Sequence, residues 1–283
     1  MTSREVISRS AAGLRRLLLG RGGAAFEARF AEAFPARNEF GVDPFGYSLD
    51  YSLWVLGPLL WFYRHYYRVQ CHGIEKLPAG RVLLVANHSG QIPIDAGMIA
   101  CATLLEAPRP RAVRGMTEKW IATLPVASTF MARTGMVVGT PENCRKLLAA
   151  EEAVLVFPEG IRGIVKPWKK RYRLQEFGAG FVRLALQTAT PIVPVAVIGG
   201  EEQMPAIAQS AFLGRLLGIP SVPLPVTLFP FPAKYHLWFG DPLRIEGDPR
   251  DSEADLSAHA GRVKEELQRM IQRGLAERRH VFW

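Results

Sequence analysis

The chain has 283 residues, 48% of them hydrophobic, which is enough to bury a core in one large domain or in a domain with an appendage. Its net charge of +9 and its pI near 9.7 favour an anionic partner, either nucleic acid, a phosphorylated ligand or an anionic membrane. No nucleic-acid recognition motif accompanies this charge, so we expect no nucleic-acid partner. The three cysteines have neither disulfide nor metal spacing, which indicates a reducing compartment and no metal site.

The first 34 residues predict two apolar helical stripes. Residues 4–20 have the pattern of a basic amphipathic helix, and Phe26, Phe30 and Phe34 recur every four residues. Such helices either lie on anionic lipid or dock on their own domain, and the pattern favours neither alternative. The longest early apolar run, at residues 17–19, is too short for a secretory signal.

Residues 51–67 are rich in Trp and Tyr. The uncharged run from Tyr51 to Tyr63 is shorter than the roughly 20 residues that a bilayer span needs, and we expect Gly57-Pro58 to break it. Because Trp and Tyr favour the membrane interface, we interpret the segment as a helix that lies in or dips into one leaflet. The alternative is an aromatic helix in the protein core.

The rest of the chain alternates between predicted strands and helices. Apolar runs predict strands at residues 82–85, 111–116, 135–138, 153–157, 191–198 and 236–239. Helical patterns fall at residues 96–107, 119–133, 141–152, 177–187 and 251–277. This alternation indicates an α/β fold with a mixed, largely parallel sheet of about six or seven strands, covered by helices on both faces. Residues 205–231 are apolar and Pro-rich, and we expect an interfacial or lid element there.

A histidine stands where the first of these strands ends. The strand at 82–85 runs into Asn87-His88-Ser89-Gly90, and strand ends are the usual place for ligands in an open α/β sheet. Asp95 follows seven positions after His88, near enough to fold back onto the imidazole. A histidine held by a carboxylate is a poised general base. The alternative is a turn histidine with a helix-capping aspartate, the commoner reading of an isolated pair.

A second polar loop follows the strand at 153–157. Glu159 and Arg162 lie three residues apart among glycines, and Arg suits bidentate contact with phosphate, so this loop predicts a polar-ligand site. A surface ion pair of little energetic value is the alternative. A basic stretch comes next, with Trp168 and Tyr172 between its cations: Lys166, Lys169, Lys170, Arg171 and Arg173. It fits phosphates or lipid head groups as well as it fits a solvated loop.

Three stretches together resemble the glycerolipid acyltransferase family, which includes bacterial lysophosphatidic acid acyltransferases. The matching motifs are Asn87-His88 with Asp95, Phe157-Pro158-Glu159-Gly160-Ile161-Arg162, and Val193-Pro194-Val195. The resemblance covers roughly residues 70–245. It implies an acyltransferase domain at 71–283, behind a membrane-associating helical segment at 1–70 on the cytoplasmic face of a membrane.

The sequence departs from the family pattern twice. Six residues separate His88 from Asp95, whereas the family usually has four. The second motif usually carries an Arg that is thought to bind the acceptor phosphate, and the corresponding stretch here, residues 137–140, reads Val-Val-Gly-Thr. Arg114 and Lys166 are the candidates to replace that Arg. The sequence is closer to the branch that resembles monoacylglycerol and diacylglycerol acyltransferases.

The residues and the resemblance together predict acyl transfer. His88 would take the proton from an acceptor hydroxyl that attacks an acyl thioester, and Asp95 would fix the imidazole. Backbone N–H groups near the Ser89-Gly90 turn are candidates to stabilise the oxyanion. The candidate substrate-binding residues are Asn87, Ser89, Gly90, Gln91, Arg114, Phe157, Pro158, Glu159, Gly160, Ile161, Arg162 and Lys166.

The expected partners follow from this chemistry. The donor is acyl-CoA or acyl carrier protein, the acceptor is a lysophospholipid or a mono- or diacylglycerol, and no metal or other cofactor is required. An acyl-thioester or lipid hydrolase could use the same His–Asp pair with water. A non-enzymatic lipid-binding protein of the membrane surface would explain the aromatic residues and the charge, but would leave His88, Asp95, Glu159 and Arg162 without roles.

Overall fold

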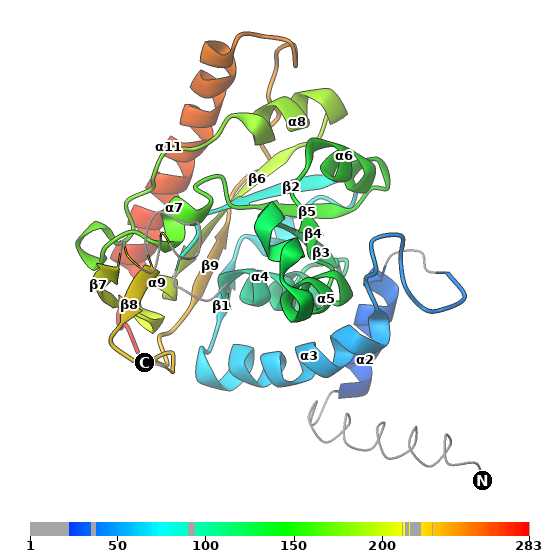
Figure 1. Cartoon of the computed structure of the whole chain (residues 1–283), viewed down its shortest axis with the longest axis horizontal. Helices are drawn as coiled ribbons and strands as arrows, with labels where there is room; N and C mark the ends of the chain where they lie inside the picture. The colour runs from blue at the N-terminus through cyan, green and yellow to red at the C-terminus, as the bar shows by residue number, and fades with distance from the viewer. Residues whose placement is uncertain are drawn as a thin grey trace.

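Seven strands form one sheet in the order β1-β9-β6-β2-β5-β3-β4 (Figure 1). The structure is a computed structural model that describes residues 23–34, 38–89, 94–210, 212, 215, 222–227 and 229–282. The strands of this sheet are β1 (Gln70–His72), β2 (Val82–Ala86), β3 (Val113–Thr117), β4 (Val137–Val138), β5 (Ala153–Val156), β6 (Ile192–Ile198) and β9 (His236–Phe239). Strands β6, β2, β5, β3 and β4 are parallel, whereas β9 is antiparallel to β6 and β1 runs parallel to β9. The predicted mixed, largely parallel sheet is confirmed.

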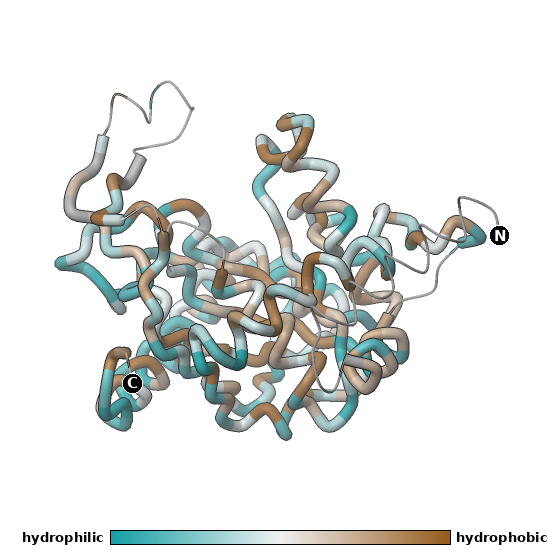
Figure 2. Tube along the Cα trace, turned by 90° about the horizontal axis from the view of Figure 1, so that it is seen from below, coloured by the Kyte–Doolittle hydropathy of each residue, from teal (hydrophilic) through white to brown (hydrophobic). Residues whose placement is uncertain are grey.

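Helices cover both faces of this sheet, as the alternation of strands and helices predicts (Figure 1). The helices are α2 (Gly23–Ala33), α3 (Leu49–Trp61), α4 (Ile94–Leu105), α5 (Pro125–Arg133), α6 (Pro141–Ala149), α7 (Ile161–Ile164), α8 (Gly180–Thr188), α9 (Gly200–Gln203) and α11 (Glu253–Glu277). Successive side chains of a strand point to opposite faces. In β2, Leu84 therefore packs in a core with α2, α3 and α4, whereas Leu83 and Val85 pack with α6, α8 and α11. Brown hydrophobic segments accordingly run through the interior in Figure 2.

The N-terminal aromatic stripe docks on the protein itself. Phe26 and Phe30 of α2 are buried in the same core cluster as Met98 and Leu104 of α4. For residues 23–34 the structure therefore favours the docked alternative. The amphipathic pattern at 4–20 lies outside the described residues, and the division between residues 1–70 and 71–283 stays a prediction.

The aromatic segment at 51–67 forms one continuous helical stretch, so the expected break at Gly57-Pro58 is wrong. Helix α3 runs through Pro58, which is exposed, and passes into a short π-helix, η1 (Phe62–Tyr66). A proline removes its own N–H donor and its ring crowds the carbonyl four residues earlier, but a helix held by packing on one side tolerates both effects. Leu53, Leu56 and Leu60 are buried in the core, while 51% of Trp61 is exposed. None of the described helices is long and apolar enough to cross a membrane.

The Pro-rich stretch at 205–231 contributes a separate two-stranded sheet. Strands β7 (Ala206–Ser210) and β8 (Val222–Pro225) pair antiparallel at the left of the molecule in Figure 1. Between them the structure describes only residues 212 and 215. A lid or interfacial role for this stretch stays a prediction.

Candidate active site

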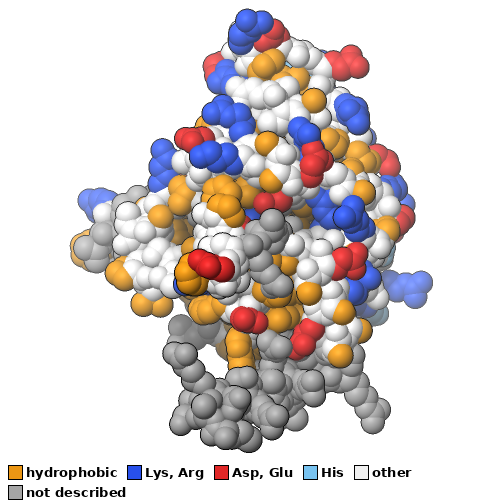
Figure 3. Space-filling model, turned by 90° about the vertical axis from the view of Figure 1, so that its right-hand side faces the viewer, with side chains coloured by type: hydrophobic (Ala, Val, Ile, Leu, Met, Phe, Trp, Pro, Cys, Tyr) orange, Lys and Arg blue, Asp and Glu red, His pale blue; other side chains and the backbone are white. Residues whose placement is uncertain are grey.

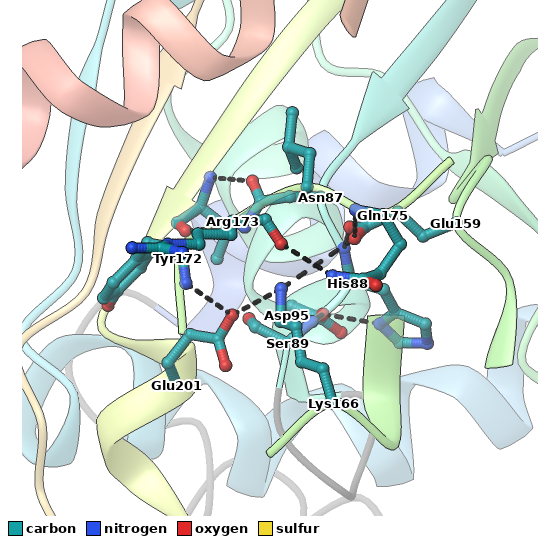
Figure 4. Close-up of polar contacts among 12 residues, drawn as sticks. Asn87, His88, Ser89, Asp95, Glu159, Lys166, Tyr172, Arg173, Gln175 and Glu201 are labelled. Carbon is teal, nitrogen blue, oxygen red and sulfur yellow. Dashed lines mark hydrogen bonds and ion pairs between the residues drawn. The ribbon is translucent and has the colours of Figure 1, made fainter. Parts of the chain in front are cut away.

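The end of β2 and the first turn of α4 bring His88 and Asp95 together (Figure 4). His88 Nδ1 lies 2.7 Å from Asp95 Oδ2. The unusual spacing therefore does not prevent the pair, although residues 90–93 are not among those that the structure describes. Asp95 is completely buried, whereas 8% of His88 is exposed, so a ligand can reach the histidine but not the carboxylate.

The hydrogen bonds around Asp95 determine where the histidine carries its proton. Asp95 Oδ2 also accepts the Ser89 N–H at 2.9 Å, and Oδ1 accepts the Ala96 N–H at 2.8 Å. The carboxylate lies in the first turn of α4, where the helix dipole favours a negative charge. An ionised carboxylate can only accept hydrogen bonds, so the His88 proton is on Nδ1 and the lone pair is on Nε2. No described residue forms a hydrogen bond with Nε2, which leaves it available as a base.

Asn87 fixes the position of this turn relative to the sheet. Its side chain donates from Nδ2 to the Val197 carbonyl at 2.9 Å and accepts the Val197 N–H on Oδ1 at 2.7 Å. The amide thereby extends the pairing of β2 with β6 by one residue beyond Ala86. Asn87 is fully buried, so it positions His88 rather than contacting a substrate as we expected.

The loop after β5 forms the wall beside the imidazole. The Phe157 ring stacks on His88, with ring centroids 4.1 Å apart and planes 18° apart. Gly163 is part of the short helix α7, which follows Pro158 and Gly160 and begins at Ile161. It lies so close that a Cβ atom there would come within 3.1 Å of His88 Cβ. Gly160 has φ +56° and ψ −146°, a conformation that requires glycine, and it begins α7 at the point where the chain turns across His88.

Glu159 points into the protein, which differs from the expected contact with a substrate head group. Its Oε1 accepts the backbone N–H of His88 at 3.2 Å, and its Oε2 accepts the backbone N–H of Gln175 at 2.8 Å. Only 1% of Glu159 is exposed. Arg162 does not join it: the guanidinium is exposed and lies 3.7 Å from Glu176 Oε2. The structure therefore separates the two residues that we expected to hold one ligand.

Lys166 is also turned inward, beside Glu159. Its ammonium is 2.7 Å from Glu201 Oε1 and 3.8 Å from Glu159 Oε2, and its side chain is 2% exposed (Figure 4). Burial raises the pKa of Glu201, and the positive charge of Lys166 opposes that rise. We did not anticipate a role for Glu201 or Gln175. The signal for Glu201 was its position directly after the buried strand β6, at the same sheet edge as His88.

Arg114 lies outside the site, so the expectation that it replaces the missing motif Arg is wrong. Its side chain is completely buried, and Nη1 is 2.6 Å from Asp43 Oδ2 and 2.8 Å from Glu152 Oε2. Its Nε donates to the Gly135 carbonyl at 2.9 Å. Burial raises the pKa of Glu152, and the Arg114 charge opposes that rise. Arg114 therefore joins the N-terminal segment to β3 and cannot contact an acceptor phosphate.

The described N–H groups of the catalytic turn already have hydrogen-bond partners, so an oxyanion site at this turn stays a prediction for the residues beyond Ser89. The Ser89 N–H bonds to Asp95 and the His88 N–H bonds to Glu159. Neither is free for an oxyanion, and Gly90 and Gln91 lie outside the described residues. Ser89 Oγ is buried without a hydrogen-bond partner in the described part of the chain, and a Cβ on Gly200 would approach it to 2.0 Å.

An apolar cavity of about 280 Å³ opens between α3, α4, α5 and the sheet. Ile94 and Ala96, the two neighbours of Asp95, belong to its wall. Its other lining residues are largely aliphatic or aromatic, among them Leu56, Leu59, Ala100, Leu104, Phe130, Met136 and Leu155. The site thus combines a buried His–Asp pair with a nearby apolar hollow. Among the described residues no group of three or more His, Cys, Asp or Glu could hold a metal ion.

Comparisons with known proteins agree with this architecture. The Acyltransferase family model matches residues 68–198. An uncharacterized protein of Mycobacterium tuberculosis (strain ATCC 25618 / H37Rv) is 35% identical over 261 residues, which cover 87% of this chain and 73% of that protein. The enzyme of Mus musculus named DGAT1/2-independent enzyme synthesizing storage lipids is 24% identical over 220 residues, covering 78% of this chain and 63% of that protein.

A solved structure shows the same fold. It is the 1-acyl-sn-glycerophosphate (LPA) acyltransferase PlsC from Thermotoga maritima, with a TM-score of 0.52 and 18% identity over 92% of this chain and 95% of that one. Together these matches define the protein as an O-acyltransferase. The chain belongs to the Acyltransferase family, whose model spans His88, Asp95 and Glu159.

Proposed function

We propose that the protein transfers an acyl chain from an acyl thioester, acyl-CoA or acyl carrier protein, to a hydroxyl group of a glycerolipid. The observation that carries this proposal is the His88–Asp95 pair, with Nδ1 and Oδ2 2.7 Å apart and Nε2 free. His88 Nε2 removes the proton from the acceptor hydroxyl as the oxygen attacks the thioester carbonyl. Asp95 holds the tautomer and stabilises the imidazolium. The imidazolium then protonates the leaving thiolate, so the enzyme ends each turnover unchanged.

The apolar cavity supports a lipid-chain substrate. It adjoins Asp95 through Ile94 and Ala96, and hydrophobic side chains form most of its wall. Pockets for small ligands are mostly apolar, with a few placed polar groups, and this cavity fits that description. We assign it to the acyl chain of the donor, whose thioester would then lie near the His88 imidazole.

The charges in the site support a neutral acceptor over lysophosphatidic acid. The family's second-motif Arg is absent, Arg114 is enclosed by Asp43 and Glu152, and Lys166 is held by Glu201. To reach either of these buried cations, an acceptor phosphate would have to break the cation's ion pair, which costs more free energy than an exposed ion pair returns. We therefore assign monoacylglycerol or diacylglycerol as the acceptor, a choice that fits the storage lipids in the name of the mouse relative.

Exposed hydrophobic side chains near the cavity support membrane association. They lie on α3, on the 3-10 helix η3 (Lys119–Thr123), and at and within α5: Tyr51, Trp61, Trp120, Leu124, Val126 and Phe130. Phe130 also lines the cavity and lies 6.4 Å from the Tyr51 ring. Hydrophobic side chains are visible among Lys and Arg on the face shown in Figure 3. Trp and Tyr favour the interfacial zone of a bilayer, which a lipid acceptor also occupies.

The test is acyl transfer from a labelled long-chain acyl-CoA or acyl carrier protein to a panel of acceptors in liposomes. The panel contains monoacylglycerol, diacylglycerol, lysophosphatidic acid and other lysophospholipids, and His88→Ala is the control variant. We expect transfer to the neutral glycerides that His88→Ala abolishes without unfolding the protein. Transfer by a folded His88→Ala variant at the wild-type rate would exclude the mechanism. Release of free fatty acid without acceptor would instead indicate a hydrolase.

A further inference from the structure

The basic stretch after Glu159 forms a fixed loop across the active-site edge. We call residues 166–175 the cationic strap. Its buried side chains, Lys166, Tyr172 and Leu174, point into the protein, while those of Lys169, Lys170, Arg171 and Arg173 are exposed. The strap therefore presents four positive charges to solvent from a backbone that is anchored below.

Acidic side chains of the active-site region hold the strap at both ends. At its start, Lys166 forms the ion pair with Glu201. At its end, the Gln175 N–H donates to the same Glu159 carboxylate that holds the His88 backbone. The strap is thus connected to the catalytic turn through one side chain (Figure 4).

Two further contacts fix the middle of the strap. The Tyr172 N–H donates to Glu201 Oε1 at 3.2 Å, and the Tyr172 hydroxyl bonds to Glu202. Gln268 of α11 receives the Leu174 N–H at 3.0 Å and donates to the Tyr172 carbonyl at 2.9 Å. These bonds fix the backbone from which the neighbouring cations project.

The four exposed cations are not neutralised by direct ion pairs in the described part of the chain. None of them forms an ion pair with a described residue, and Arg171 instead lies 4.6 Å over the Trp168 ring. Like charges on adjacent residues repel one another, and a flexible loop would relax by spreading them. Here the anchors fix the backbone that carries the cations, so a positive potential persists over the strap, which Glu159 joins to the catalytic turn. Such a potential is balanced when a polyanionic ligand binds.

We propose that the cationic strap binds the phosphate groups of a CoA-type acyl donor. The inference rests on the proposed acyl transfer and names the donor class for it. With the acyl chain in the apolar cavity and the thioester at His88, the phosphorylated end of the donor extends from the site into solvent, where the strap's cations are exposed. Arg and Lys are the side chains that bind phosphate, and exposed contacts of this kind weaken as salt is added.

The experiment compares two charge-matched variants of the full-length protein. The strap variant carries Lys169→Gln, Lys170→Gln, Arg171→Gln and Arg173→Gln. The control variant loses the same number of exposed or half-exposed cations on α6, α11 and the loop after β9, through Arg145→Gln, Arg244→Gln, Arg262→Gln and Lys264→Gln. Each is assayed with long-chain acyl-CoA and with the corresponding acyl-pantetheine, which keeps the thioester but lacks the phosphates. Binding of free CoA is measured by calorimetry at low and high salt.

We expect the strap variant to raise KM for acyl-CoA at least tenfold while kcat and the acceptor KM stay near those of the control. KM for acyl-pantetheine should not change, and the salt dependence of CoA binding should weaken. An acyl-CoA KM within twofold of the control variant would overturn the proposal. Equal increases in KM for both donors would also overturn it, because the effect of the strap would then not depend on the donor's phosphates.

Two other results would assign the strap to a different partner and so reject the proposal. One is loss of binding to anionic vesicles with CoA binding intact, which would make the strap a membrane contact. The other is transfer from acyl carrier protein alone, with no CoA binding. Failure of the wild type to transfer from any donor would reject the proposed function, while calorimetry with CoA would still decide whether the strap binds phosphates.

Discussion

Asn87 and Val197 form a pair in which a side chain takes the place of a strand residue. The Asn87 amide exchanges two hydrogen bonds with the Val197 backbone, at 2.9 and 2.7 Å, at the point where β2 has ended and His88 follows. The catalytic turn is thereby joined to β6, every residue of which is buried. His88 consequently leaves the sheet in a fixed direction, toward Phe157 and Asp95.

Replacing Asn87 by Asp should destabilise the protein by about 2 kcal/mol, because the donor to the Val197 carbonyl is lost and a buried acceptor faces it instead. Acyl transfer should fall together with stability. Chemical denaturation measures the loss. Asn143→Asp is the matched control. Asn143 Nδ2 donates to the Val138 carbonyl at a half-buried position, so this substitution should lower the free energy of unfolding by less. Equal losses of stability from the two substitutions would show that the Asn87–Val197 pair stabilises the protein no more than an ordinary half-buried hydrogen bond.

Replacing Asp95 by Asn should lower kcat by roughly a thousandfold or more, because an amide can donate to Nδ1 and so favours the wrong tautomer. The protein should remain folded, since Asn keeps the size of the side chain and one acceptor oxygen. Rate and circular dichroism are measured on the same sample. Asp241→Asn, at an exposed residue paired with Lys76, is the control and should leave kcat unchanged. A kcat for Asp95→Asn within tenfold of wild type would exclude the proposed role.

Replacing Arg114 by Met should destabilise the protein by about 3–5 kcal/mol, because Asp43 and Glu152 would be left buried without a counter-charge. Arg183→Met removes an exposed partner of Glu253 and should cost less than about 1 kcal/mol. Urea titration compares the two. In the fraction of Arg114→Met that folds, KM for the acceptor should match wild type. A raised acceptor KM with unchanged stability would return Arg114 to the list of substrate contacts.

Stability should fall as the pH is lowered from about 6.5 to about 4, because of His236. Burial, with help from His72, Lys234 and Arg278, lowers the pKa of His236 from its ordinary 6.5 to about 4. Across this window the unfolded chain binds a proton that the folded protein does not, so the free energy of unfolding decreases on acidification. Denaturation curves at several pH values should show a shallower decrease for His236→Gln. An unchanged slope would assign the acid sensitivity to other groups.

Replacing Ala100 by Phe should shift donor preference toward shorter acyl chains, because Ala100 lines the apolar cavity assigned to the chain. The ratio of kcat/KM for a long-chain and a short-chain acyl-CoA is the measurement. Ala149→Phe, at the exposed end of α6, is the control. A preference that stays the same for a folded Ala100→Phe variant would place the acyl chain elsewhere.

The sequence was informative wherever its pattern had one structural solution. The apolar run Leu83-Leu84-Val85 puts hydrophobic side chains on both faces of its strand. Such a strand must be covered on both sides, and helices do cover both faces of the sheet. Strand β1 escaped prediction, because its three residues at the sheet edge have no apolar run. The helix break predicted at Pro58 was wrong because the packing of α3 outweighs the loss of one backbone N–H donor.

Contacts in the site could be predicted where the residues lie near each other in sequence. They could not be predicted where the fold brings together residues that are far apart in sequence. His88 and Asp95 are seven residues apart, and local turn chemistry sufficed to propose the pair. Glu159 was identified, but its inward direction depends on backbone donors of His88 and Gln175 that sequence cannot orient. Arg114 seemed available for phosphate because its partner Asp43 lies 71 positions away.

The core that Phe26 and Phe30 share with Met98 and Leu104 also limits how this enzyme can be taken apart. A chain shortened to begin at residue 71 would expose to water the apolar surface of α4 and the core residues that α2 and α3 cover, and it should precipitate rather than yield a freely soluble catalytic fragment. If the protein associates with lipid as proposed, a deletion series would therefore lose lipid binding and the native fold together. Point substitutions on the outer surface of α3 and α5 are the route to separating the two properties.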